Sequence, residues 1–299
     1  MSRYLLRCLF AAILLWLACP ALVLAGNNRH DELYKEFLRL YRTGEDDQAF
    51  YQTAEELANL YKQQDQLSKY YTMQLNICLY DTEHNHPYKA LKRANEMLEE
   101  MKVGHNDNYE NVYAALGTVY ESRGNYRMAS HYYQEALSHT KADDQSSKMS
   151  VQSRLAFLYM FTNPEEARRW NATYRETSLD FPDYHQVYLF IEGVISFSMA
   201  DKKAFDRAYE TYASYASEHK LNDNYGQESM QILRKLFDRK FDEVEQLLKE
   251  ENHDLDDIGQ LDMAIRAYDY MGQKDKALQL TWQRADLVDS LNSDMLFNN

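Results

Sequence analysis

Residues 110–143 have the spacing of two helices that pack against each other. Four residues share one helix face at i, i+3, i+4 and i+7: Tyr113, Leu116, Gly117 and Tyr120. After an Arg-Gly-Asn turn, three more repeat the helical spacing: Ala129, Tyr133 and Ala136. Small residues at 117 and 129 let the two helices approach closely, and the tyrosines fill the space beside them. The segment therefore predicts an antiparallel helix hairpin.

This pattern resembles the tetratricopeptide repeat (TPR). That motif has an aromatic residue, a Leu-Gly pair and a tyrosine on its first helix, then alanine, an aromatic residue and alanine on its second. All seven residues fall at the matching offsets, whereas Lys141 stands where the repeat often has proline. The resemblance implies that the seven are structural and that ligands contact the first helix away from its packing face. In this segment those groove residues are Asn111, Thr118, Glu121 and Ser122.

Looser copies of the hairpin follow one another along the chain, at intervals of roughly 33 to 41 residues that bracket the TPR period. First helices are expected to begin near Asp31, Leu67, Asn108, Ser147, Tyr184, Tyr225 and Asp257. Second helices are expected to begin near Asp46, Pro87, Tyr126, Pro164, Lys202, Phe241 and Lys274. No Pro-, Ser- or Gly-rich linker divides them. We predict an all-α, TPR-like superhelical solenoid of about seven antiparallel helix hairpins over residues 26–299.

Residues 1–25 have the pattern of a secretory signal peptide. Two arginines precede an uninterrupted apolar run at residues 8–19, and small residues precede Gly26. We expect cleavage after Ala25 and an exported protein of the periplasm or cell envelope. An uncleaved membrane anchor and lipid attachment at Cys19 are the alternatives. N-terminal sequencing or mass spectrometry is expected to find Gly26 first, and a retained Met1 or a lipidated Cys19 would contradict the prediction.

The charge balance limits the kinds of partner. The formal net charge of −14 disfavours nucleic-acid binding, because that function needs a basic surface. It disfavours peripheral binding to anionic lipid membranes for the same reason. We therefore expect membrane contact only through the N-terminus or through a partner. Cys78 is the one cysteine outside residues 1–25, so no internal disulfide is expected, and its apolar helical neighbours predict a buried, inert thiol.

The sequence contains no recognised catalytic motif and no phosphate-binding glycine loop. Metal-ligating side chains occur at residues 81–86, but within one short stretch, which favours a solvated polar turn over a metal site. Residues 242–262 hold nine acids and only partly match a calcium loop, because Ile258 occupies a ligand position. We expect no catalytic residue, no metal and no cofactor.

The expected function is binding. An exported, non-catalytic TPR scaffold would hold a peptide, protein or small ligand in its groove, with a protein or peptide partner in the cell envelope. Most of residues 26–299 also resembles the extracytoplasmic TPR region of bacterial membrane-bound sensor histidine kinases. That resemblance implies an alternative: the sensory half of a two-component signalling receptor, truncated or split from its membrane and kinase parts. On this alternative, the apolar residues 295–297 dock on a partner instead of folding back as a cap.

Overall fold

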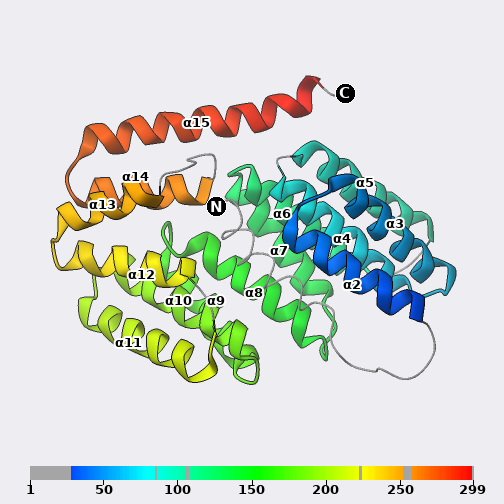
Figure 1. The fold of residues 1–299 in the computed structure, drawn as a ribbon, viewed down its shortest axis with the longest axis horizontal. Coiled ribbons are helices and arrows are strands. Elements are labelled where there is room, and N and C mark those ends of the chain that lie inside the picture. Colours follow the sequence, from blue (N-terminus) through cyan, green and yellow to red (C-terminus); the bar gives the residue numbers. More distant parts are fainter. Residues whose placement is uncertain (1–27, 85, 105–107, 222–223, 252–257, 298–299) are drawn as a thin grey trace. The chain divides into compact units, whose positions relative to one another are not determined.

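The fold is described by a computed structural model over residues 28–297, except 85, 105–107, 222–223 and 252–257 (Figure 1). This part of the chain holds 14 α-helices and no β-strand. Consecutive helices pair into hairpins that pack in sequence. The predicted all-α helix-hairpin solenoid is confirmed.

Helix positions also agree with the sequence. The first helices of the hairpins are α2 (Asn28–Thr43), α4 (Leu67–Glu83), α6 (Tyr109–Ser122), α8 (Gln145–Tyr159), α10 (Pro182–Ser198), α12 (Asn224–Phe237) and α14 (Ile258–Tyr270). The second helices are α3 (Asp47–Gln63), α5 (Pro87–Gly104), α7 (Tyr126–His139), α9 (Pro164–Ser178), α11 (Lys202–His219), α13 (Phe241–Glu251) and α15 (Lys274–Phe297). Each begins within three residues of its expected start.

Local chemistry fixes where second helices begin. Four of them follow an Asp or Asn whose side-chain oxygen accepts a hydrogen bond from the backbone N–H three residues on, which stabilises a helix N-terminus. These caps are Asp46, Asn125, Asn163 and Asp201. Three of the turns within hairpins also contain a glycine with positive φ, a conformation that other residues adopt at a cost. These glycines are Gly44, Gly124 and Gly272.

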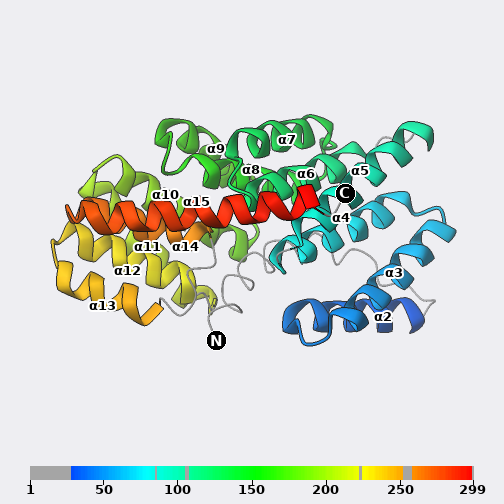
Figure 2. The same cartoon turned by 90° about the horizontal axis from the view of Figure 1, so that it is seen from above.

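The described residues form two compact units, one reaching as far as Val151 and the other running from Gln152 to Phe297. The division falls inside α8. In the first unit α6 and α7 make the most extensive helix pairing, and in the second unit α10 pairs with α11 and α14 with α15. Figure 2 shows α14 and α15 side by side.

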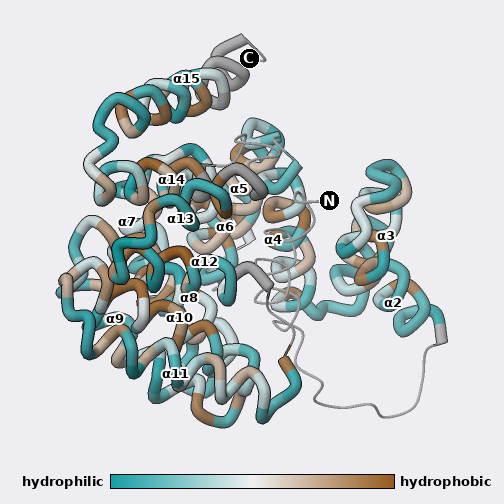
Figure 3. Tube along the Cα trace, turned by 60° about the vertical axis from the view of Figure 1, so that its left-hand side comes forward, coloured by the Kyte–Doolittle hydropathy of each residue, from teal (hydrophilic) through white to brown (hydrophobic). Residues whose placement is uncertain are grey.

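First and second helices differ in how they are buried. In Figure 3 hydrophobic colour runs round much of α10, whereas α9 is mostly hydrophilic. No residue of α6 is fully exposed, and α4 and α10 are almost as enclosed. The second helices α3, α5, α7 and α9 instead bury a stripe at their fourth, eighth and eleventh residues. In α7 these are Ala129, Tyr133 and Ala136, and in α5 they are Ala90, Ala94 and Met97.

None of the helices in the described residues combines the length and the apolar character that a membrane span requires. The predicted signal peptide and the cleavage point before Gly26 lie outside the described residues.

Candidate functional site

The hairpin of α6 and α7 is held by a close approach at Gly117. A Cβ atom at this position would lie 2.5 Å from Cδ1 of Tyr133. The buried Tyr133 hydroxyl donates to Oε2 of Glu121 at 2.5 Å and lies 3.1 Å from Oγ1 of Thr118. The absence of a side chain at residue 117 thus lets the tyrosine ring reach two polar partners on the first helix.

The other motif residues divide into two groups. Leu116, Ala129 and Ala136 are fully buried. Tyr113 and Tyr120 are only half-buried, and both stack with Tyr132, which the motif does not include. Two of the tyrosines that the motif predicts to be packing residues therefore reach the surface.

The four groove residues do not share an open surface. Asn111 and Thr118 are buried, and Asn111 Nδ2 donates to Glu110 Oε1 at 3.3 Å. Ser122 is half-buried, and its hydroxyl donates to the carbonyl of Val119 at 2.9 Å. Thr118 and Glu121 both contact Tyr133 on the second helix. This differs from the expectation that all four lie away from the packing face, because α6 is enclosed on more sides than its periodicity reveals.

The surface that this hairpin does offer is a row of stacked rings, here called the tyrosine row. Its members are Tyr109, Tyr113, Tyr120, Tyr132 and His139. Ring centroids lie 5.9 Å apart between Tyr109 and Tyr113, 6.2 Å between Tyr113 and Tyr132, and 5.4 Å between Tyr120 and Tyr132. The Arg123 guanidinium lies 5.7 Å from the Tyr120 ring centre.

The tyrosine row has unused polar capacity. Partial burial raises the pKa of the Tyr132 hydroxyl above its ordinary value. Within the described residues, no hydrogen bond engages the hydroxyls of Tyr113, Tyr120 or Tyr132. Rings with free hydroxyls can both stack and hydrogen-bond with a peptide. Sequence reasoning missed Tyr109 and Tyr132, although Tyr132 and His139 share a helix face at i and i+7.

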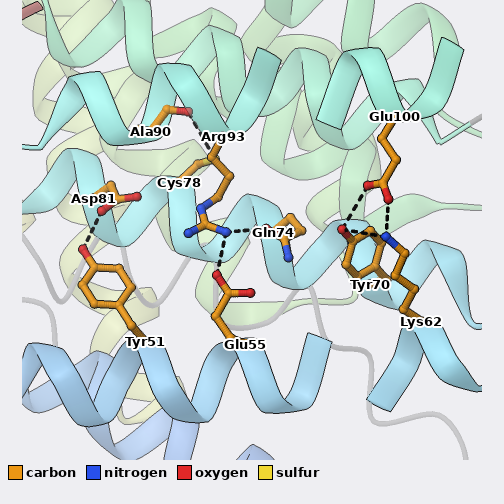
Figure 4. Close-up of polar contacts among 10 residues, drawn as sticks. All are labelled: Tyr51, Glu55, Lys62, Tyr70, Gln74, Cys78, Asp81, Ala90, Arg93 and Glu100. Atoms are coloured by element: carbon orange, nitrogen blue, oxygen red, sulfur yellow. Dashed lines mark hydrogen bonds and ion pairs between the residues drawn. The ribbon is translucent and has the colours of Figure 1, made fainter. Parts of the chain in front are cut away.

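A second polar cluster joins α3, α4 and α5 (Figure 4). Arg93 Nη1 donates to Glu55 Oε1 at 2.8 Å and to Gln74 Oε1 at 2.7 Å. In the first turn of α4, the Tyr70 hydroxyl donates to Glu100 Oε2 at 3.0 Å, and Lys62 pairs with the same carboxylate. Burial, together with Glu100, raises the pKa of Tyr70 to about 12. The contacts made by α3 connect successive hairpins and the others join α4 to α5, so this cluster is structural.

Asp81 is the most deeply buried carboxylate of this cluster, with 1% of its surface exposed. Oδ1 accepts a hydrogen bond from the Tyr51 hydroxyl at 2.5 Å, whereas Oδ2 has no hydrogen-bond partner among the described residues. Burial raises the pKa of Asp81, although the Tyr51 hydroxyl and nearby cations such as Arg93 oppose the shift. The ionised carboxylate is thus disfavoured in the folded protein.

We expect Asp81→Asn to remove a pH-dependent loss of stability. Because the pKa of Asp81 is raised on folding, the unfolded chain releases the proton first as pH rises, and the free energy of unfolding falls between the two pKa values. Urea denaturation of both proteins from pH 4 to pH 7 measures this. The Asp81→Asn variant should gain stability relative to the natural protein as pH rises, and a pH-independent difference would contradict the assignment.

The side chains of Asp81 and His84, two candidate metal ligands in residues 81–86, point in different directions. The His84 ring stacks on Tyr80 with centroids 3.8 Å apart, and its Nδ1 lies 2.8 Å from the Tyr80 carbonyl oxygen. Asp81 instead contacts α3 through Tyr51. No group of three or more His, Cys, Asp and Glu side chains is placed to hold a metal ion in the described part of the chain. Asn85 and residues 252–257 of the acidic run lie outside it.

Cys78 is fully buried on α4, with Sγ 3.5 Å from the Ala90 carbonyl oxygen. Burial raises the pKa of this thiol well above its ordinary value, so the reactive thiolate is suppressed. We expect Cys78 to resist iodoacetamide in the native protein and to react at the ordinary rate in urea. Peptide mapping after timed labelling checks this, and rapid native alkylation would show that α4 opens readily.

Comparisons with known proteins find no match to a protein-family model, a curated protein or a solved structure.

Proposed function

We propose that this chain is a non-catalytic, TPR-like scaffold that binds a protein or peptide partner. The tyrosine row carries this proposal, because it combines half-exposed stacked rings with unbonded hydroxyls on the hairpin whose sequence best resembles a TPR. Aromatic side chains of this kind supply large contact areas at low entropic cost. The rigid support beneath the row, where Tyr133 packs on Gly117, favours a preformed binding surface.

The finer parts of the proposal rest on the sequence. The apolar, basic-flanked residues 1–25 support export, which puts the partner in the periplasm or cell envelope. The resemblance to sensor histidine kinases favours a second candidate, the sensory half of a two-component receptor. The nucleotide sequence downstream of the Asn299 codon distinguishes the two candidates. A reading frame that continues into a membrane span and a kinase domain supports the receptor. A stop codon argues against a receptor fused to its kinase.

Site-specific photocrosslinking in the native host tests the binding surface. A benzophenone side chain in place of Tyr132 is expected to capture an envelope protein. The same group in place of Arg169, an exposed residue of α9, is the control and should not capture that protein. Tyr120→Ala should reduce the yield of the Tyr132 adduct. Equal capture at both positions, or none at Tyr132, would contradict the proposed site.

A further inference from the structure

Second helices contact the following hairpin through corresponding positions. In α3 the fifth residue, Tyr51, donates to Asp81 on α4, and the ninth residue, Glu55, pairs with Arg93 on α5. In α13 the fifth residue, Glu245, lies 3.2 Å from Nζ of Lys276 on α15. The fifth residues of the second helices from α3 to α13 are all at least half-buried, and in α3 the ninth residue also contacts the next hairpin.

In α15 these two positions are apolar and open. They are Leu278 and Trp282, with 55% and 64% of their surface exposed. The equivalent positions in α3 hold a tyrosine and a glutamate, which satisfy polar partners. A leucine and a tryptophan one helical turn apart instead suit an apolar partner surface, and tryptophan is enriched among the residues that dominate binding energy at interfaces.

Unpaired acids surround the two apolar side chains. Asp275, Asp286 and Asp289 are exposed, and none makes an ion pair within the described residues. The nearby cations are already engaged, since Lys274 pairs with Asp269 and Arg284 Nε lies 2.6 Å from Asp262 Oδ1. The open face of α15 thus combines an apolar centre with a negative border.

We propose that this face docks an amphipathic helix of a partner protein, with apolar residues along one stripe and lysine or arginine beside it. Leu278 and Trp282 would pack on the stripe, and Asp275, Asp286 and Asp289 would pair with the basic residues. The partner helix would pack as the next hairpin packs on α3. A second copy of this chain fits less well, because two such faces would bring their acidic borders together.

A model peptide tests the proposal on the full chain. The probe is a helix-forming peptide of about 18 residues with leucine on one face and lysine on the other, and a scrambled peptide of the same composition is its control. Calorimetric titration should show one site for the amphipathic peptide, weakened by salt. Trp282→Ala and Leu278→Ala should each weaken binding by about tenfold or more.

Control variants exclude trivial explanations. Leu179→Ala removes another exposed leucine, 58% exposed beside α9, and should leave the affinity unchanged. Thermal midpoints of Trp282→Ala and Leu278→Ala should match that of the natural chain, because both side chains are exposed. Tyr132→Ala should also leave peptide binding intact, so a failure of the tyrosine row and a failure of this inference can be told apart.

Three results would overturn the inference. If Trp282→Ala binds the amphipathic peptide as tightly as the natural chain does, attraction is electrostatic and α15 is not the site. If the scrambled peptide binds equally, no helix is recognised. If sedimentation shows self-association that Trp282→Ala abolishes, a second copy occupies the face.

Discussion

Gly117→Ala is expected to lower the free energy of unfolding by about 2 kcal/mol, within the range for overpacked cores. The added methyl group would lie 2.5 Å from Cδ1 and 2.6 Å from Cε1 of Tyr133, so the buried ring must move. That movement also strains the hydrogen bonds of Tyr133 with Glu121 and Thr118. These losses outweigh the roughly 1 kcal/mol by which alanine is favoured over glycine in a helix. Gly117→Leu should destabilise further.

Gly193 provides a matched control on α10, another enclosed first helix. A Cβ atom at this position would lie 2.6 Å from Sδ of the buried Met230 and closer still to its Cε, but these atoms are the far end of a flexible side chain that can move aside. Gly193→Ala should therefore change stability little or raise it. Urea denaturation of both variants provides the measurement. An equal loss at both sites would show that the rigidity of Tyr133 does not determine the cost.

Local sequence was sufficient to predict this fold. The seven motif residues of the α6–α7 hairpin identify a close helix contact, and the structure places Gly117 against Tyr133 within it. Cap residues such as Asp46 and Asn125 act on the backbone three residues away, so helix starts also follow from sequence. In each case the interacting groups lie within one hairpin, where helical periodicity determines which side chains meet.

The candidate site was less predictable because it depends on neighbouring hairpins. The resemblance to the TPR implies that Thr118 lies away from the packing face, but several helices enclose α6 and the residue is buried. Asp81 looked like part of a polar turn, yet its partner is Tyr51, 30 residues earlier on α3. Tyr132 was overlooked because motif positions identify packing residues and cannot show which rings remain exposed.

Tyr80→Ala is expected to lower the free energy of unfolding by about 3–5 kcal/mol, the range for deleting a large buried aromatic side chain. Its ring is fully buried and stacks on Phe50 with centroids 3.6 Å apart, while His84 stacks at 3.8 Å. Its hydroxyl donates to Asp47 Oδ1 at 2.5 Å. Because Phe50 and Asp47 are on α3, the tyrosine joins two successive hairpins.

Tyr80→Phe separates the contributions of the ring and the hydroxyl. It keeps the stack on Phe50 and removes the bond to Asp47, so it should cost only about 1–2 kcal/mol. Hydrogen exchange should show the largest loss of protection for Tyr80→Ala in α3 and α4, because repeat proteins are stabilised mainly by contacts between neighbours. If Tyr80→Phe is as destabilising as Tyr80→Ala, the hydrogen bond and not the aromatic stack holds the two hairpins together.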